Sequence, residues 1–295
     1  MANLTLKERF IGPQTAGRRP RRAAYALPTF FTAGNIFLGF LAIVRSFQGA
    51  IAVSQGSLGS NRNFEVAAAA IGVAVVADGL DGRIARMTNT VSDFGREMDS
   101  LADVITFGIA PAILAFTWGV QFVPPDPGNL LHRIGYFLSF LFLLCGAARL
   151  ARFNVQTNPI PKNPGRPDRK YFIGLPIPAA AGIVAAIVFA CDSVPVVWWV
   201  WSAMWLLLLA IVSFLMVSTW RYPSFKDVHF MQPRSPLSII LIAALIYLVW
   251  IFPQPVLLGL SVTYVATGIM IRAGGIIRRR FRQNPPRPQP ESQVG

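Results

Sequence analysis

Long apolar runs separated by short polar segments dominate the pattern along this chain of 295 residues. The runs are close to the length of about 20 residues that an α-helix needs to cross the hydrocarbon core of a bilayer. The pattern therefore predicts an all-α integral membrane protein with eight spans. They are expected at about residues 27–47, 64–77, 98–118, 134–150, 172–191, 196–217, 237–252 and 255–271.

The distribution of positive charge predicts the orientation of these spans. The chain has 27 Lys and Arg residues against 13 Asp and Glu, a formal net charge of +14. Such a balance suits either nucleic acid or anionic lipid, and the apolar runs favour lipid, so no nucleic-acid partner is expected. With both termini inside, only Arg45, Arg62 and Arg133 fall near outer segments. By the positive-inside rule, both termini are expected in the cytoplasm.

Acidic side chains at helical spacing mark the stretch from residue 78 to residue 103. It contains six of the chain's 13 Asp and Glu residues and joins the inner ends of the second and third expected spans. Because a helix advances about 100° per residue, each segment gathers its small and acidic residues on one face. The first face carries Asp78, Asp81, Gly82 and Ala85 with Arg86 at its edge, and the second carries Gly95, Asp99 and Asp103.

Two such faces opposite each other would bring the four aspartates to one point. Four carboxylates so close together cannot all stay ionised without positive charge between them. Oxygen ligands alone suit hard divalent cations such as Mg²⁺, Mn²⁺ or Ca²⁺, and a divalent cluster at a membrane interface suggests phosphate chemistry. Two alternatives stay open. The aspartates could pair with Arg83, Arg86 and Arg96 in a salt-bridge network, or they could serve an ion or proton transporter.

The motif as a whole matches a family pattern. The chain carries every fixed position of Asp-x-x-Asp-Gly-x-x-Ala-Arg-x8-Gly-x3-Asp-x3-Asp, from Asp78 to Asp103. It thereby resembles the CDP-alcohol phosphotransferases, membrane enzymes that move a substituted phosphate from a CDP-linked donor to an alcohol and release CMP. The resemblance implies a six-helix transmembrane core at residues 27–217, usually in a homodimer. Residues 218–271 would add an inner loop and two C-terminal transmembrane helices.

The flanking segments resemble bacterial phosphatidylserine synthases in particular. The resemblance covers roughly residues 27–190 and departs at Thr29, where these first spans usually carry Asn. It implies transfer of the phosphatidyl group from CDP-diacylglycerol to the hydroxyl of L-serine. Glycerol phosphate, inositol phosphate or choline as acceptor, and a non-catalytic lipid-binding role, stay open. The matching segments begin at Leu27-Pro28, Phe94-Gly95, Arg149-Leu-Ala-Arg152 and Gly174-Leu-Pro176.

The resemblance also implies a role for each site residue. Two divalent cations, Mg²⁺ or Mn²⁺, would be held by Asp78, Asp81, Asp99 and Asp103, and Asp103 would also be the general base. The CDP moiety would contact Gly82, Ala85, Arg86, Gly95 and Thr32. The serine carboxylate would be bound by Arg149, Arg152 and Asn154, although snorkelling toward the interface is an alternative role for the two arginines. The entry at Gly174–Pro178 would shape the acceptor pocket or only kink its helix.

Further expectations concern the rest of the chain. Residues 1–26 form a basic cytoplasmic segment, and residues 272–295 form a basic, Pro-rich tail that is expected to be disordered. The first span would act as the insertion signal, placing the site on the cytoplasmic face of a bacterial inner membrane. The last three spans carry no buried charge and are expected to be structural.

Individual small residues and thiols complete the expectations. Gly34 and Gly39 would permit close helix packing in the first span, and Pro111 would kink the third. Cys145 and Cys191 are expected to be buried thiols without a disulfide or a metal.

Overall fold

The computed structural model describes residues 22–57, 59–88, 93–125, 127–157, 171–223 and 236–282. The expectations for residues 1–21 and 283–295 lie outside this range. The helices and strands follow in chain order as α1 (Arg22–Ser54), α2 (Arg62–Thr88), α3 (Asp93–Asp103), the π-helix η2 (Val104–Ile109), α4 (Ala110–Gly119), α5 (Leu130–Thr157), β1 (Tyr171–Ile173), α6 (Ile177–Ala190), α7 (Trp199–Val217), β2 (Arg221–Pro223), α8 (Pro236–Ile251) and α9 (Pro253–Arg282).

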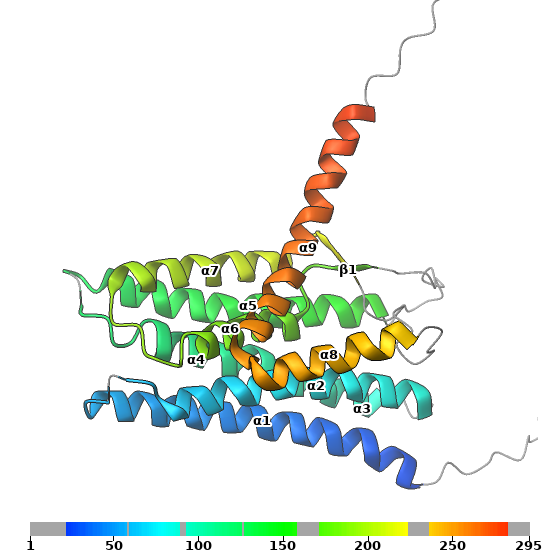
Figure 1. The fold of residues 1–295 in the computed structure, drawn as a ribbon, viewed down its shortest axis with the longest axis horizontal. Helices are drawn as coiled ribbons and strands as arrows, with labels where there is room; N and C mark the ends of the chain where they lie inside the picture. The colour runs from blue at the N-terminus through cyan, green and yellow to red at the C-terminus, as the bar shows by residue number, and fades with distance from the viewer. Residues whose placement is uncertain are drawn as a thin grey trace, which may run out of the picture.

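The helices from α1 to α7 form a bundle whose members run along one common axis (Figure 1). Helix α2 ends and α3 begins at the same end of this bundle, which we call the motif end. The short antiparallel pair of β1 and β2 also lies there, with Phe172 opposite Tyr222. Helix α9 leaves the bundle axis at a steep angle and packs against α6 and β2.

The core of the bundle is built around small side chains on α2. Ala67, Ala70, Ile71 and Ala74 are buried there, and α2 packs on one side against α1 and on the other against α6. Alanine has high helix propensity and a short side chain, so it lets neighbouring helices approach closely. The middle of α2 is therefore fixed by packing against two helices.

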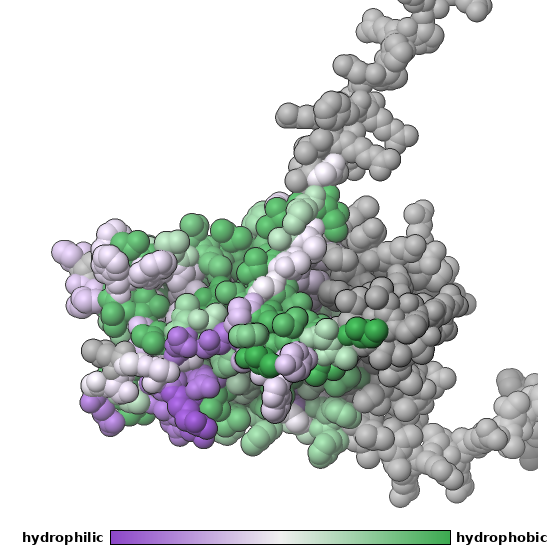
Figure 2. All heavy atoms as spheres, in the orientation of Figure 1, coloured by the Kyte–Doolittle hydropathy of each residue, from purple (hydrophilic) through white to green (hydrophobic). Residues whose placement is uncertain are grey.

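The outward faces of the bundle are apolar. Figure 2 shows hydrophobic surface along the flanks of the described part, and exposed side chains there include Phe37, Phe40, Val76 and Phe137. In water such exposure would cost about 25 cal/mol for each Å². Six described helices are long and apolar enough to cross a membrane. The expected fold class is confirmed, and the chain is a multi-pass membrane protein.

The structure differs from the expected spans in several places. Helices α6 and α8, with 14 and 16 residues, are shorter than the roughly 20 residues that cross a bilayer without tilt or thinning. Strands β1 and β2 were not expected, because three-residue strands leave almost no pattern in a sequence. Helix α9 continues to Arg282, so residues 272–282 are helical where disorder was expected. The cytoplasmic location of the termini stays a prediction.

A π-helix interrupts the third span directly after Asp103. The hydroxyl of Thr106 within it donates a hydrogen bond to the carbonyl of Asn35 on α1, at 2.8 Å. Pro111 lies in the first turn of α4, where a missing N–H is tolerated. The kink expected at Pro111 is therefore replaced by a π-helical segment just before it. Such segments occur frequently at functional sites.

Gly39 permits the close contact between α1 and η2. A Cβ built on Gly39 would lie 2.6 Å from Oγ1 and 2.8 Å from the backbone Cα of Thr106, whereas one on Gly34 meets nothing within 4 Å. The expectation of close packing is confirmed for Gly39 and is wrong for Gly34.

We expect Gly39→Ala to destabilise the protein by about 1–3 kcal/mol, the usual cost of overpacking. The matched change Gly34→Ala should be neutral or slightly stabilising, because Ala has the higher helix propensity. Thermal unfolding of both variants in the same detergent measures the difference. Equal midpoints for the two variants would show that the contact of α1 with η2 is not tight.

Candidate active site

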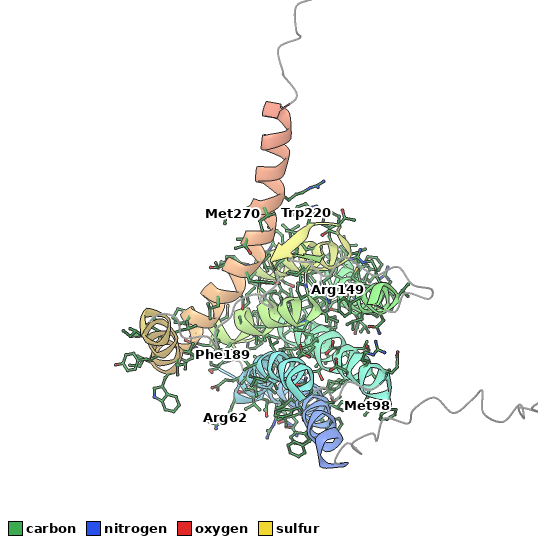
Figure 3. The ribbon with its side chains drawn as sticks, turned by 90° about the vertical axis from the view of Figure 1, so that its right-hand side faces the viewer. Arg62, Met98, Arg149, Phe189, Trp220 and Met270 are labelled. Carbon is green, nitrogen blue, oxygen red and sulfur yellow. The ribbon has the colours of Figure 1, made fainter. Side chains whose placement is uncertain are left out.

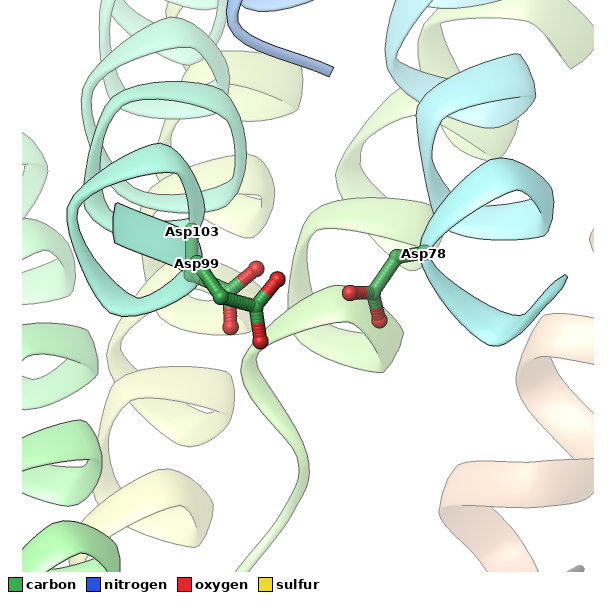
Figure 4. A group of neighbouring side chains, drawn as sticks. All are labelled: Asp78, Asp99 and Asp103. Atoms are coloured by element: carbon green, nitrogen blue, oxygen red, sulfur yellow. The ribbon is translucent and has the colours of Figure 1, made fainter. Parts of the chain in front are cut away.

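Three carboxylates converge at the motif end of the bundle. Asp78 comes from α2, and Asp99 and Asp103 lie one turn apart on α3. Both helices pack against α1, and the three side chains point toward one another (Figure 4). One oxygen of each carboxylate lies within 4.8 Å of the others, and all three residues are half-buried. The predicted convergence of Asp78, Asp99 and Asp103 is thus present in the fold.

This donor set fits a hard divalent cation. The group offers only carboxylate oxygens, which suit Mg²⁺ or Mn²⁺, and three negative charges at this separation repel one another unless a cation lies between them. Asp81 follows about one turn after Asp78 on α2, but its side chain lies outside the described part of the structure, as do those of Arg86 and Ala85. Their contacts, and that of Gly82, stay predictions.

Helix α1 forms a polar wall near the cluster. Thr32 and Asn35 are buried on it, about one turn apart, and α1 packs against both α3 and η2. Among the described residues, Oδ1 of Asn35 has no hydrogen-bond partner. Gly95 lies on α3 one turn before Asp99. The predicted contacts of Thr32 and Gly95 with CDP are untested.

The three residues expected to bind the serine carboxylate all lie on α5, and their role in binding serine stays a prediction. Arg152 donates a hydrogen bond to the carbonyl of Val217, the last residue of α7, at 3.1 Å, and so caps that helix. Asn154 on α5 donates to the hydroxyl of Ser100 on α3, at 2.9 Å. Both therefore make structural links between elements in this structure.

Arg149 differs from Arg152 in its surroundings. It is 8% exposed, and it interacts electrostatically with Asp103 on α3 and with Tyr264 on α9. Its Nε has no hydrogen-bond partner within the described ranges. A buried guanidinium with an unused donor beside the acidic cluster can bind a small anion, so Arg149 is the strongest candidate of the three.

Gly174 fixes the start of α6 beside these arginines. Its φ of +79° is in the left-handed region, and its N–H donates to the carbonyl of Trp220 at 2.8 Å. A Cβ at this position would collide with the carbonyl of Met216 and would lie 2.9 Å from Nη2 of Arg152. Glycine is therefore required here by both backbone conformation and space. Its role in the acceptor pocket stays a prediction.

Two tyrosines near Arg149 were missed by sequence reasoning. Tyr264 on α9 and Tyr222 on β2 have ring centroids 6.0 Å apart. The last three spans were expected to be structural, and this stays a prediction, but Tyr264 in the eighth expected span interacts electrostatically with Arg149. The available signal was a single tyrosine within the eighth expected span, since buried tyrosine hydroxyls normally have a polar partner.

The two cysteines lie elsewhere in the bundle. Cys145 is half-buried and Cys191 is exposed at the end of α6, so the expectation of burial is wrong for Cys191. Residual burial and the neighbouring Asp192 raise the pKa of the Cys191 thiol, which keeps it protonated and weakly nucleophilic. Neither thiol is disulfide-bonded.

A comparison with known families shows the family of this chain. A family model described as CDP-alcohol phosphatidyltransferase matches residues 25–210, which include the three clustered aspartates and Arg149. The chain belongs to the CDP-alcohol phosphatidyltransferase family. The match ends within α7 and leaves α8 and α9 outside it.

Several curated proteins resemble this family member over much of its length. A CDP-diacylglycerol–serine O-phosphatidyltransferase of Helicobacter pylori is 36% identical over 250 residues, covering 83% of this chain and 91% of the relative. The enzyme of the same name from Bacillus subtilis is 31% identical, covering 68% of this chain and 91% of the relative. An archaetidylserine synthase of Methanothermobacter thermautotrophicus is 36% identical over 163 residues, covering 55% and 57%.

We expect the purified protein to bind Mn²⁺ through the clustered carboxylates. Replacing Asp78 or Asp99 by Asn removes a charged oxygen ligand and should weaken binding at least tenfold, measured by electron paramagnetic resonance of free and bound Mn²⁺. Glu97→Gln is the matched control, because Glu97 lies on the same helix but is exposed. Equal affinity in all three variants would show that the cluster is not the metal site.

Proposed function

We propose that this protein transfers the phosphatidyl group from CDP-diacylglycerol to the hydroxyl of L-serine, giving phosphatidylserine and CMP. The observation that carries the proposal is the convergence of Asp78, Asp99 and Asp103 beside the buried Arg149 within a membrane bundle of this family. The relatives named as serine O-phosphatidyltransferases, which match most of the chain, support L-serine as the acceptor.

The acidic residues of the motif hold two divalent cations, Mg²⁺ or Mn²⁺. One carboxylate oxygen of each of Asp78, Asp99 and Asp103 lies within 4.8 Å of the others, and Asp81 lies about one turn further along α2. When bound, such cations neutralise the pyrophosphate of the donor and make its phosphorus more electrophilic. The oxygen-only donor set supports this assignment over softer metals.

Asp103 acts as the general base. Its carboxylate takes the proton from the serine hydroxyl as the serine oxygen forms a bond to the phosphorus that carries diacylglycerol. The bond between this phosphorus and the oxygen of CMP breaks, and CMP leaves with the electron pair. A positioned base of this kind contributes about 10²- to 10⁴-fold to the rate. Arg149 holds the serine carboxylate beside Asp103, so that the hydroxyl reaches the base in a fixed orientation.

The CDP moiety lies along the motif faces of α2 and α3. Gly82 and Gly95 have no side chain and let the backbone approach a bulky ligand, with Ala85 between them in sequence. Arg86 pairs with a donor phosphate, and Thr32 reaches the nucleotide from α1. The burial of Thr32 on the helix that packs against α3 supports this placement.

The site faces the cytoplasm of a bacterial inner membrane, and the protein is a homodimer. The concentration of Lys and Arg in segments near the motif end supports the orientation, and the basic segments favour anionic lipid nearby. The dimer follows from the family resemblance. Residues 27–217 form the catalytic core, residues 1–26 and 272–295 flank it, and the lipid tails of the donor remain in the apolar region.

A substrate panel tests the proposal. Purified protein is incubated with CDP-diacylglycerol, Mg²⁺ or Mn²⁺ and one of L-serine, glycerol phosphate, inositol phosphate or choline, and CMP release is measured. We expect release with L-serine, its loss on adding EDTA, and recovery on restoring the metal. Release with another acceptor and none with serine would contradict the proposal.

Asp103→Asn separates catalysis from a passive lipid-binding role. Asparagine keeps the shape but cannot accept the proton, so we expect serine-dependent CMP release to fall by about 10²-fold or more. Glu97→Gln, an exposed change on the same helix, should leave the rate unchanged. A wild-type rate in the Asp103→Asn enzyme would overturn the assigned role.

A further inference from the structure

Helix α9 contacts the motif end although it lies outside the range matched by the family model. That range ends at residue 210, whereas α9 spans Pro253–Arg282 and packs against α6 and β2. In Figure 3, which turns this end toward the viewer, α9 rises along the left side of the bundle and passes the strand that follows Trp220. A helix that supported the fold only from outside would not need polar contacts here.

The contact between α9 and β2 is unusually close. A Cβ on Gly268 would collide with the ring of Tyr222, so only glycine lets the helix approach this far. About one turn earlier on α9, the ring of Tyr264 lies 6.0 Å from that of Tyr222, at an angle of 35°. Gly268 thereby sets the position of Tyr264 relative to the hairpin.

Tyr222 is fully buried with a free hydroxyl. It is 0% exposed, and among the described residues its Oη has no hydrogen-bond partner. Burial raises the pKa of this phenol above its ordinary value, so it stays protonated and can donate. A buried hydroxyl without a hydrogen-bond partner is unfavourable, so a group that accepted a hydrogen bond from it would be stabilised.

Tyr264 extends this polar group to Arg149. Arg149 interacts electrostatically with Tyr264 on α9, with Asp103 on α3 and, repulsively, with Arg152 on its own helix. Its Nε has no partner within the described ranges. A buried guanidinium that interacts electrostatically with both Tyr264 and Asp103, and that has a donor left over, can receive an oxyanion next to the reacting hydroxyl.

We propose that Tyr264, held in place by packing against Tyr222, is a positioning residue that orients Arg149 toward the carboxylate of the acceptor, so that α9 determines acceptor specificity. The inference rests on the proposed function and adds to it the residues that select the acceptor. The acceptor class that fits is a small amino alcohol carrying a carboxylate. Arg149 could also bind a phosphate of the donor, which is an oxyanion too. The kinetic experiment distinguishes the acceptor carboxylate from the donor phosphate.

The test is initial-rate kinetics of full-length Tyr264→Phe in detergent, with serine and CDP-diacylglycerol varied in turn. The ring remains, so packing against Tyr222 is kept while the hydroxyl is lost. We expect the KM for serine to rise about tenfold, equivalent to about 1.4 kcal/mol, with kcat and the KM for the donor unchanged. Selectivity for serine over ethanolamine, which is serine without its carboxylate, should fall by the same factor.

Matched variants control for structural effects. Tyr247→Phe removes a hydroxyl from an exposed tyrosine on α8 and should have wild-type constants. Gly268→Val moves α9 away from Tyr222 and should raise the KM for serine, whereas Gly259→Val, on the same helix with nothing within 4 Å of its Cβ, should not. If Gly268→Val fails to fold, Tyr264→Phe alone decides.

Three results would overturn the inference. A wild-type KM for serine in Tyr264→Phe removes the positioning role. A rise in the KM for the donor alone assigns Arg149 to the donor phosphate instead. If Tyr264→Phe keeps the wild-type selectivity for serine over ethanolamine, these residues do not recognise the carboxylate of the acceptor. Absence of serine-dependent CMP release from the wild-type protein would instead contradict the proposed function, and this inference with it.

Discussion

The packing at the motif end of the bundle must hold Asp78, Asp99 and Asp103 together although their negative charges repel one another. Two like charges about 4 Å apart repel by about 1 kcal/mol in water and about 4 kcal/mol near a protein surface. The three carboxylates nevertheless lie within 4.8 Å, because α2 and α3 are each held by packing that does not involve the carboxylates. The packing of the core therefore offsets the repulsion and keeps the acidic site assembled for a cation.

The scaffold holds α3 mainly through α1. Gly39 lets α1 approach η2, and the bond from Thr106 to the Asn35 carbonyl ties the two helices directly after Asp103. On the far side of α3, Ser100 accepts from Asn154 of α5. Asp103 thus lies between attachments at Ser100 and Thr106, and Asp99 directly precedes the first, which limits how far repulsion can turn the two carboxylates away.

The cationic side of the site depends on elements distant in sequence. Arg149 lies on α5, the Tyr222 strand follows α7, and Tyr264 comes from α9. Arg152 resembles Arg149 in sequence but caps α7 through Val217. Two arginines three residues apart lie near the same side of α5 but differ in their contacts, because Arg149 interacts with Asp103 whereas Arg152 reaches the end of α7.

The sequence by itself determined the membrane class, the helical placement of the motif and the facing of its aspartates, because each follows from local periodicity and hydropathy. Helical spacing alone placed Asp99 and Asp103 on one face of α3. Only the tertiary structure decided that Arg149 and Arg152 differ, that Gly39 is in a tight contact while Gly34 is open, and that Tyr264 reaches the site. Those outcomes depend on which helices meet and at what angle. They are contacts between residues far apart in the chain, and no local pattern of residues encodes them.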